Sequence, residues 1–305
     1  MVKETVQYTE AIASQLLGAL TLKKRLKSYG RWAIITGCTR GIGLEFSRQL
    51  AELGVDLVLI ARNPKLLNEL ALELRVKHGV EVEQIVANFS RDDAALYDEI
   101  KERLKRLEGP IGILVNNVGV FFESPRYFHE VSEKDIKDSV NVNVTASLLL
   151  SHHIIKEHML PRNRGLVVFL GSAASIRINP LFNAYAASKA YVEYLAQTLH
   201  EEYKKTGIYV QALLPFYVAT DMATYSASAP SLLAPSARTY AKAAITVFGM
   251  SPITSAYFPH TLQRFIKRGL PDWFYQFAYR SKVEKFRADH LEKTKNIQEP
   301  TAPKK

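Results

Sequence analysis

A tyrosine and a lysine stand four residues apart in the segment Tyr185-Ala186-Ala187-Ser188-Lys189. On a helix, positions i and i+4 share one face, so the lysine ammonium would lie near the phenol. A nearby positive charge favours the phenolate and is expected to lower the pKa of Tyr185 from its usual value near 10. The pair therefore predicts a general acid and base for a carbonyl or alcohol oxygen.

A Tyr-x-x-x-Lys spacing often occurs by chance, so the accompanying polar residues carry much of the weight. Ser172 precedes Tyr185 by thirteen residues and follows an apolar run, and Asn143 lies within a predicted helix over residues 132–160. The predicted catalytic residues are therefore Asn143, Ser172, Tyr185 and Lys189.

A glycine-rich segment, Thr36–Gly43, joins a short apolar run to a predicted helix over 41–53. Gly37 permits a tight turn, Gly41 lets the backbone approach a pyrophosphate, and Gly43 allows close packing of helix on strand. The spacing is G-x-x-x-G-x-G rather than G-x-G-x-x-G. Its position after the first strand nevertheless favours a dinucleotide site over an ordinary strand–helix turn.

The end of the second apolar run, Ile60–Asn63, bears on the choice of cofactor. NAD-specific sites place an acid there for the ribose 2′-hydroxyl, and this segment holds none. Arg62 would pair with a 2′-phosphate, and Arg40 would join it, since a planar guanidinium suits bidentate phosphate contact. The alternative is a surface arginine that caps the sheet. We predict NADP(H) as the cofactor.

Apolar runs and amphipathic segments alternate along the chain. The predicted strands are 32–36, 56–61, 80–87, 111–115, 166–170 and 208–214, with helices over 41–53, 92–107, 132–160 and 184–204 and another opening at Asn63-Pro64. This order predicts an α/β fold with a Rossmann-type doubly wound parallel sheet and helices on both faces. Residues 216–240, rich in Ser, Ala and Pro, are predicted to form a loop.

The order and spacing of these motifs resemble the short-chain dehydrogenase/reductase family over about residues 30–259. The segment Asn116-Asn117-Val118-Gly119 adds to the likeness. The resemblance implies that Ser172 holds the substrate oxygen, Tyr185 exchanges its proton and Lys189 binds the nicotinamide ribose. It further implies that Asn143 holds a water in the proton relay, and that the stretch with Pro215, Val218 and Thr220 orients the carboxamide.

Two positions depart from the family pattern. Asn88 stands where an Asp usually contacts adenine, although its amide oxygen can accept one hydrogen bond, and Phe216 replaces a common Gly and is expected to narrow the nicotinamide side. No metal site is predicted, because His152, His153 and His158 have no neighbouring acid or cysteine cluster and are interpreted as packing or interface residues. The predicted cofactor-binding residues are Gly37, Thr39, Arg40, Gly41, Ile42, Gly43, Arg62, Asn88, Asn116, Gly119, Tyr185, Lys189, Pro215, Val218 and Thr220.

Two groups within the family share further segments with this chain. Leu199–Tyr203 and Glu292–Asn296 resemble the 17β-hydroxysteroid dehydrogenase type 12 group, also called very-long-chain 3-oxoacyl-CoA reductases, whereas Tyr29–Ala33 and Pro215–Thr220 resemble hydroxysteroid dehydrogenase-like protein 1. The first likeness implies an NADPH-dependent reductase of a lipid carbonyl, either a 3-oxoacyl-CoA or a ketosteroid. The second implies a non-catalytic NADP(H)-binding protein, although this chain keeps Tyr185. A soluble reductase of small xenobiotic carbonyls is a third hypothesis.

The net charge of +10 is confined to the two ends of the 305-residue chain. Residues 1–31 hold six Lys and Arg against two acids, residues 264–305 hold eleven against five, and the stretch between them is neutral. Such ends suit an anionic phospholipid surface, or they are simply solvated. No nucleic-acid motif accompanies them. The apolar run Ala11–Leu20 is shorter than the roughly 20 residues that a membrane-spanning helix needs.

These features predict three parts of the chain. Residues 1–29 form a basic amphipathic N-terminal segment, 30–259 an NADP(H)-binding catalytic domain, and 260–305 an aromatic and basic C-terminal segment. The last segment either covers an acyl or steroid pocket or lies at a bilayer surface. We predict peripheral contact with the cytosolic face of the endoplasmic reticulum membrane, with the mitochondrion as the alternative and a homodimer as an open question.

Overall fold

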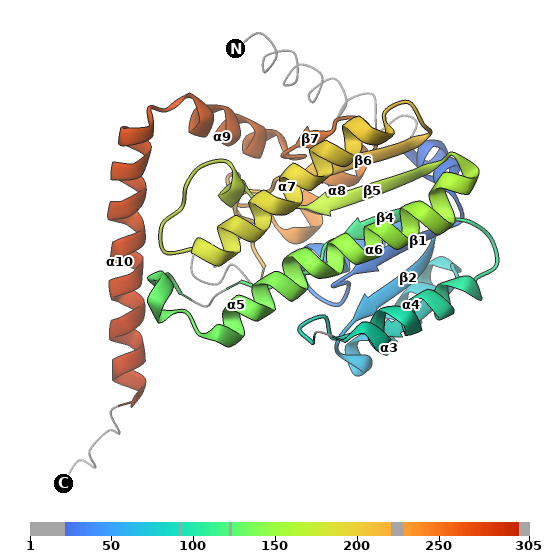
Figure 1. Ribbon diagram of the computed structural model, residues 1–305, viewed down its shortest axis with the longest axis horizontal. Helices are drawn as coiled ribbons and strands as arrows, with labels where there is room; N and C mark the ends of the chain where they lie inside the picture. Colours follow the sequence, from blue (N-terminus) through green and yellow to red (C-terminus); the bar gives the residue numbers. More distant parts are fainter. Residues whose placement is uncertain (1–21, 92, 122–123, 221–228, 299–305) are drawn as a thin grey trace.

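A seven-stranded parallel sheet forms the centre of the protein (Figure 1). The structure, a computed structural model, describes residues 22–91, 93–121, 124–220 and 229–298. The strand order is β3-β2-β1-β4-β5-β6-β7. The strands are β1 (Trp32–Thr36), β2 (Asp56–Ala61), β3 (Val82–Val86), β4 (Ile111–Asn116), β5 (Gly165–Leu170), β6 (Ile208–Leu213) and β7 (Ile253–Thr254).

From β1 to β3 successive strands are added toward one edge of the sheet, and from β4 onward toward the other, so the strand order reverses between β1 and β4. Sheets of this kind bind ligands outside the carboxyl ends of the strands, at the point where the order reverses. All five residues of β1 are buried, and Ala33 and Ile35 pack into one hydrophobic cluster while Trp32 and Ile34 pack into the other. A strand covered on both faces needs an unbroken apolar run, as the sequence shows. The predicted doubly wound fold is confirmed.

Helices cover both faces of the sheet. One layer holds α2 (Gly41–Glu52), α3 (Pro64–His78) and α8 (Ala237–Thr246), and the other holds α4 (Ala94–Lys105), α6 (Ala146–Ile154) and α7 (Asn183–Tyr203). Their termini follow from local chemistry. The Asn63 side chain caps α3 by accepting from the backbone N–H of Leu66, and Gly79 ends that helix in the left-handed conformation.

The helix predicted over residues 132–160 is continuous but not uniform. It comprises α5 (Glu133–Val140), a π-helical turn η2 (Asn141–Thr145), α6, a second π-helical turn η3 (Ile155–Met159) and the short η4 (Leu160–Arg162). Ser132 begins it by accepting from the N–H of Asp135 at 3.1 Å. Such π turns are frequent at functional sites. The first of them carries Asn143.

Two segments have more structure than the sequence predicted. Residues 22–29 are helical and bury Leu26 and Tyr29 in the core beside α8, while Arg25 donates to the Thr246 carbonyl at 2.6 Å. The segment Ala11–Leu20 lies outside the described residues. Part of the predicted loop over 216–240 is helical, since α8 begins at Ala237 behind the capping side chain of Ser236.

Two helices complete the C-terminal region, α9 (Phe258–Gly269) and α10 (Asp272–Gln298). In Figure 1, α10 stands beside the ends of α5 and α7 and away from the sheet. Within the described part of the chain, no helix is both long enough and apolar enough to cross a bilayer.

Candidate active site

A cavity of about 980 Å³ opens at the carboxyl edge of the sheet. The loops that follow β1, β2, β3, β4, β5 and β6 all line it, and α9 and α10 contribute its far wall. The lining includes Gly37, Thr39, Arg40, Gly41, Ile42, Arg62, Asn88, Gly119, Ser172, Tyr185, Lys189, Pro215, Val218 and Thr220. Most of the residues predicted from separate motifs therefore share one cavity.

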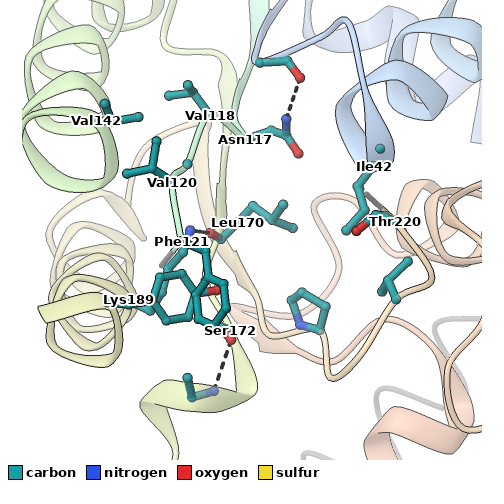
Figure 2. A pocket seen from close by; sticks show the side chains of 18 of the residues that line it. Ile42, Asn117, Val118, Val120, Phe121, Val142, Leu170, Ser172, Lys189 and Thr220 are labelled. Carbon is teal, nitrogen blue, oxygen red and sulfur yellow. Dashed lines mark hydrogen bonds between the residues drawn. The ribbon is translucent and has the colours of Figure 1, made fainter. Parts of the chain in front are cut away.

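The glycine loop is held by hydrogen bonds from the end of β4. The Thr36 hydroxyl accepts from the N–H groups of Asn117 and Val118, both at 3.0 Å, and Asn117 Nδ2 donates to the carbonyl of Thr36 at 2.9 Å. Figure 2 shows the Asn117 side chain pointing back to this loop. A Cβ added at Gly43 would come closer than 3.0 Å to Gly37 and Asn117. Gly43 therefore serves packing and does not line the cavity, unlike Gly37 and Gly41.

Asn116 was predicted to bind the cofactor, but its side chain does not line the cavity, and the contact stays a prediction. Its side chain is buried on the opposite side of β4, where Nδ2 donates to the Ser151 hydroxyl of α6 at 2.8 Å. Successive strand residues point to opposite faces, so Asn117 faces the cavity instead. Asn117 was not among the predicted cofactor-binding residues, although strand alternation distinguishes the two asparagines.

The end of the cavity beside β1 and β2 is lined by two arginines, and no acid directly follows β2. Arg40 and Arg62 are both exposed there. Asn88 also lines this end, and its Oδ1 accepts from the N–H of Ser90 at 3.2 Å and from the Ser90 hydroxyl at 2.7 Å. The predicted contact between that oxygen and adenine would compete with Ser90.

Lys189 lies in the interior at the centre of the cavity wall. Its Nζ donates to the Leu170 carbonyl at 2.8 Å and lies 5.9 Å from the centroid of the Tyr185 ring. Burial lowers the pKa of Lys189 to about 8. A Cβ added at Gly119 would lie 3.4 Å from this Nζ, so the glycine keeps the space beside the ammonium open.

The predicted lowering of the Tyr185 pKa is wrong for this structure. Burial raises the pKa of Tyr185, while the hydrogen bond with the Ser172 hydroxyl acts in the opposite direction. The Phe121 ring packs edge to face against Tyr185 with centroids 4.5 Å apart and contributes to its apolar surroundings. A phenol with a raised pKa keeps its proton at neutral pH, which suits donation to a carbonyl oxygen.

Hydrogen bonds to nearby backbone groups and to α7 position Ser172 and Asn143. Ser172 Oγ accepts from the N–H of Ala174 at 3.1 Å, at the start of the short helix η5 (Ala173–Ser175). Asn143 Oδ1 accepts from the N–H of Val120 at 2.8 Å, and Nδ2 donates to the Ser188 hydroxyl at 2.9 Å. Asn143 thus ties the loop after β4 to α7, and its predicted relay water stays a prediction.

The other end of the cavity is mostly aromatic. Phe216 lines it, as expected, together with Phe121, Phe182, Tyr217, Tyr275, Tyr279, Val283 and Phe286. Lys267 lies among these rings, with Nζ donating to the Ala173 carbonyl at 2.7 Å and 5.1 Å from the Tyr275 ring centroid. The aromatic and basic composition suggested a cover for a pocket, but it did not identify Lys267, Tyr275 or Tyr279 as lining residues.

Arg177, after β5, holds the junction of α9 and α10 against the cavity. Its guanidinium donates to the carbonyls of Lys267 at 3.2 Å, Arg268 at 2.6 Å and Leu270 at 2.7 Å, and it pairs with Asp272. These bonds satisfy carbonyls that the end of α9 leaves unpaired. Further along α10, Arg287 pairs with Glu130 of η1 (Phe128–Glu130).

The histidines of the long helix pack against each other. The rings of His153 and His158 lie 5.6 Å apart, edge to face, and burial lowers the pKa of His153 to about 4. Among the described residues, no three His, Cys, Asp or Glu side chains come together in a way that would hold a metal ion.

Comparison with known proteins agrees with this geometry. Residues 31–230 match the family model of the short chain dehydrogenases. The chain is 40% identical over 268 residues to the very-long-chain 3-oxoacyl-CoA reductase of Rattus norvegicus, covering 87% of this chain and 84% of that protein. It is 38% identical over 252 residues to the inactive hydroxysteroid dehydrogenase-like protein 1 of Homo sapiens, covering 82% and 75% of the two chains.

A solved structure shows the same architecture. A short-chain dehydrogenase from Sphingobium yanoikuyae, in complex with NADPH, superposes with a TM-score of 0.68 at 25% identity and covers 90% of this chain and 98% of its own. The chain therefore belongs to the short-chain dehydrogenase family, as an oxidoreductase of CH–OH and C=O groups that uses a nicotinamide dinucleotide.

Proposed function

We propose that this protein is an NADPH-dependent reductase of a lipid carbonyl, either a 3-oxoacyl-CoA or a ketosteroid. The observation that carries the proposal is the layout of one cavity. Arg40 and Arg62 line one end, Tyr185 lies beside Ser172, and an aromatic wall forms the other end. An extended dinucleotide and an apolar substrate would thus meet at Tyr185.

The cofactor preference rests on charge. The exposed guanidinium groups of Arg40 and Arg62 suit a 2′-phosphate, and no acid follows β2 to bind a free 2′-hydroxyl. When bound, the nicotinamide supplies the hydride. We propose the same cofactor-binding residues that the sequence predicts, with two changes. Asn117 takes the place of Asn116, and Gly43 acts through packing.

The protein's own residues handle the proton. Tyr185 holds a proton at neutral pH because burial raises its pKa, and its hydroxyl donates that proton to the substrate oxygen. Ser172 orients the same oxygen through its hydroxyl. Lys189 holds the cofactor ribose, with its position set by the Leu170 carbonyl, and Asn143 fixes the loop that carries Gly119.

The substrate class rests on the aromatic end of the cavity and on the relatives. A wall of Phe and Tyr side chains suits an acyl chain or a steroid ring system. The relative from Rattus norvegicus is named a very-long-chain 3-oxoacyl-CoA reductase, and the human relative a hydroxysteroid dehydrogenase-like protein. A small xenobiotic carbonyl, the third hypothesis, would leave most of this wall unused.

A non-catalytic NADP(H)-binding protein is the rival function, because the human relative is named inactive. In this chain Ser172, Tyr185 and Lys189 line one cavity, and Asn143 braces the loop beside them. A binding module has no need of all four residues. Their presence favours the enzyme.

We also propose peripheral contact with the cytosolic face of the endoplasmic reticulum membrane, with the mitochondrion as the alternative. The support is the positive charge of the ends, residues 1–31 and 264–305, beside a neutral middle. The molecular mass of the protein in solution would show whether it forms a homodimer.

The test is NADPH oxidation by the purified protein against a panel of 3-oxoacyl-CoAs, ketosteroids and retinoids. We expect turnover with at least one of the first two classes and a preference for NADPH over NADH. Tight NADPH binding without turnover on any carbonyl would favour the non-catalytic rival.

A further inference from the structure

Helix α9 turns polar side chains toward the interior and large apolar side chains toward solvent. His260, Thr261 and Arg264 are buried. Large apolar side chains on the same helix are exposed instead, namely Phe258, Leu262, Phe265 and Ile266. A surface helix normally turns its apolar stripe to the core and its polar residues to water.

The polar face is fixed inside by specific contacts. His260 Nδ1 accepts from the N–H of Phe216 at 3.4 Å, and its Nε2 donates to the Leu233 carbonyl at 3.3 Å. Lys267 bonds the Ala173 carbonyl inside the cavity wall. Because these bonds set the rotation of α9, its apolar stripe cannot turn inward.

The apolar stripe is followed by more exposed aromatic residues at the start of α10. Trp273, Phe274 and Phe277 are all exposed, Trp273 to 73%. The connection between the helices is short (Figure 1). The guanidinium of Arg177 holds it through the carbonyls of Arg268 and Leu270. We call this set the α9–α10 apolar face, comprising Leu262, Phe265, Ile266, Trp273, Phe274 and Phe277. Clusters of large exposed apolar side chains mark interaction sites.

The positive charge around this face favours an anionic partner. Residues 258–287 hold seven Lys and Arg and two acids. Arg264 is buried and Lys267 lies in the cavity wall, which leaves five basic residues at least partly exposed against the two acids, whereas the stretch from 32 to 263 is neutral. Aromatic side chains among basic ones suit the headgroup layer of an anionic bilayer. A second copy of this chain would bring the same positive charge to the contact, so self-association through this face would be opposed.

We propose that the α9–α10 apolar face lies in the headgroup region of an anionic lipid bilayer. The proposal rests on the peripheral membrane contact proposed above and assigns it a surface. Lys267, Tyr275 and Tyr279 of the same two helices line the aromatic end of the cavity. A lipid substrate would therefore reach Tyr185 from the bilayer side.

The two tryptophans of the chain give a direct test. Trp32 is buried, with 3% of its surface exposed, whereas Trp273 lies on the proposed face. The full-length protein is mixed with phosphatidylserine-containing vesicles that carry brominated acyl chains, which quench a tryptophan at the bilayer. We expect strong quenching in the wild type and little in Trp273→Phe, which keeps only Trp32.

A matched pair of double variants tests the face itself. Leu262→Glu with Ile266→Glu places two charges on α9, and Leu72→Glu with Val76→Glu does the same on α3, where both residues are also exposed and four positions apart. We expect the α9 variant to lose at least about tenfold in vesicle affinity, since interfacial binding scales with buried apolar area. The α3 variant should bind as the wild type does, and NADPH binding should be unchanged in both.

The outcomes separate this proposal from the one on which it rests. If the wild type floats with anionic vesicles while Trp273 is not quenched, membrane contact occurs elsewhere and the assigned surface is wrong. If the wild type does not float at low salt, both proposals fail. A wild-type dimer that the α9 variant alone dissociates would give the face to a second copy of the chain and overturn the lipid assignment.

Discussion

The two ends of the cavity are built in different ways. The cofactor end is built around the glycine loop at the carboxyl end of β1, with Gly37 in a left-handed conformation and Gly43 in close contact with it. The substrate end is built from side chains of α9, α10, the loops after β4 and β6, and the residue before α7. The first depends on local geometry that glycine spacing reveals, and the second on packing between distant parts of the chain.

The same difference shows in how each end is held. The hydroxyl of Thr36 and the amide of Asn117 lock the glycine loop inside the sheet, among buried strands. The substrate end depends on Arg177, whose guanidinium gathers the carbonyls at the end of α9. We therefore expect substitutions at one end to leave the other largely intact.

Tyr185 lies where the two ends meet, and its substitution should have the largest effect. Tyr185→Phe keeps the ring and its packing on Phe121 and removes only the hydroxyl. General acid catalysis contributes about 10²–10⁴-fold, so turnover should fall by that factor while NADPH affinity stays near normal. Steady-state rates and a fluorescence titration with NADPH measure the two quantities. Comparable turnover by the Phe variant would contradict the assigned mechanism.

Arg62 tests the cofactor end alone. Arg62→Asp removes a charge-assisted phosphate contact worth about 1.5–3 kcal/mol and adds repulsion, so NADPH affinity should fall by at least roughly 10- to 150-fold. NADH affinity should hold or rise, because an acid after the second strand is the feature of NAD sites. Arg75→Asp on α3 is the control, since Arg75 does not line the cavity. Equal binding of both cofactors by the wild type would contradict the assignment.

The cofactor end is also the part that the sequence predicted best. The glycine loop and the i, i+4 pair of Tyr185 and Lys189 follow from local patterns, and the alternation of strands and helices predicted the doubly wound sheet. Strand alternation distinguishes Asn117, which lines the cavity, from Asn116, whose side chain faces α6. The direction of the Tyr185 pKa shift was predicted wrongly, since its surroundings include Phe121, 64 residues away in the sequence.

For the substrate end, the sequence predicted only that an aromatic and basic C-terminal segment could cover a pocket. The apolar stripe of α9 would by periodicity alone be turned to the core, yet His260 and Lys267 face inward because their partners lie at Phe216 and Ala173. No local pattern encodes contacts between segments so far apart in the chain.

Arg177 tests the substrate end alone. Arg177→Met removes the bonds to the α9 carbonyls, and a net loss of about 1–1.5 kcal/mol would raise KM for the lipid substrate by roughly five- to tenfold. NADPH affinity should be unchanged. Asp272→Asn is the matched control, because Asp272 is highly exposed and such ion pairs contribute little. If Asp272→Asn has the same effect as Arg177→Met, the carbonyl contacts are not what holds the junction.

The smallest effect concerns pH and separates the two titrating groups at the centre of the cavity. Burial lowers the pKa of Lys189 to about 8, so its positive charge is present below that pH and is lost as the pH rises through it. Burial raises the pKa of Tyr185, so the phenol keeps its proton over the same range. With saturating carbonyl substrate and limiting NADPH, the reduction rate should thus fall in a single step as the pH rises, and it should halve near pH 8.

Lys189→Arg keeps its charge at all these pH values, so the fall in rate should move to higher pH. The pH dependence of NADPH binding by the wild type provides the same readout without turnover. A fall near pH 10 instead would mean that Lys189 titrates as a solvated lysine does, and that its burial behind Leu170 does not govern the cofactor end.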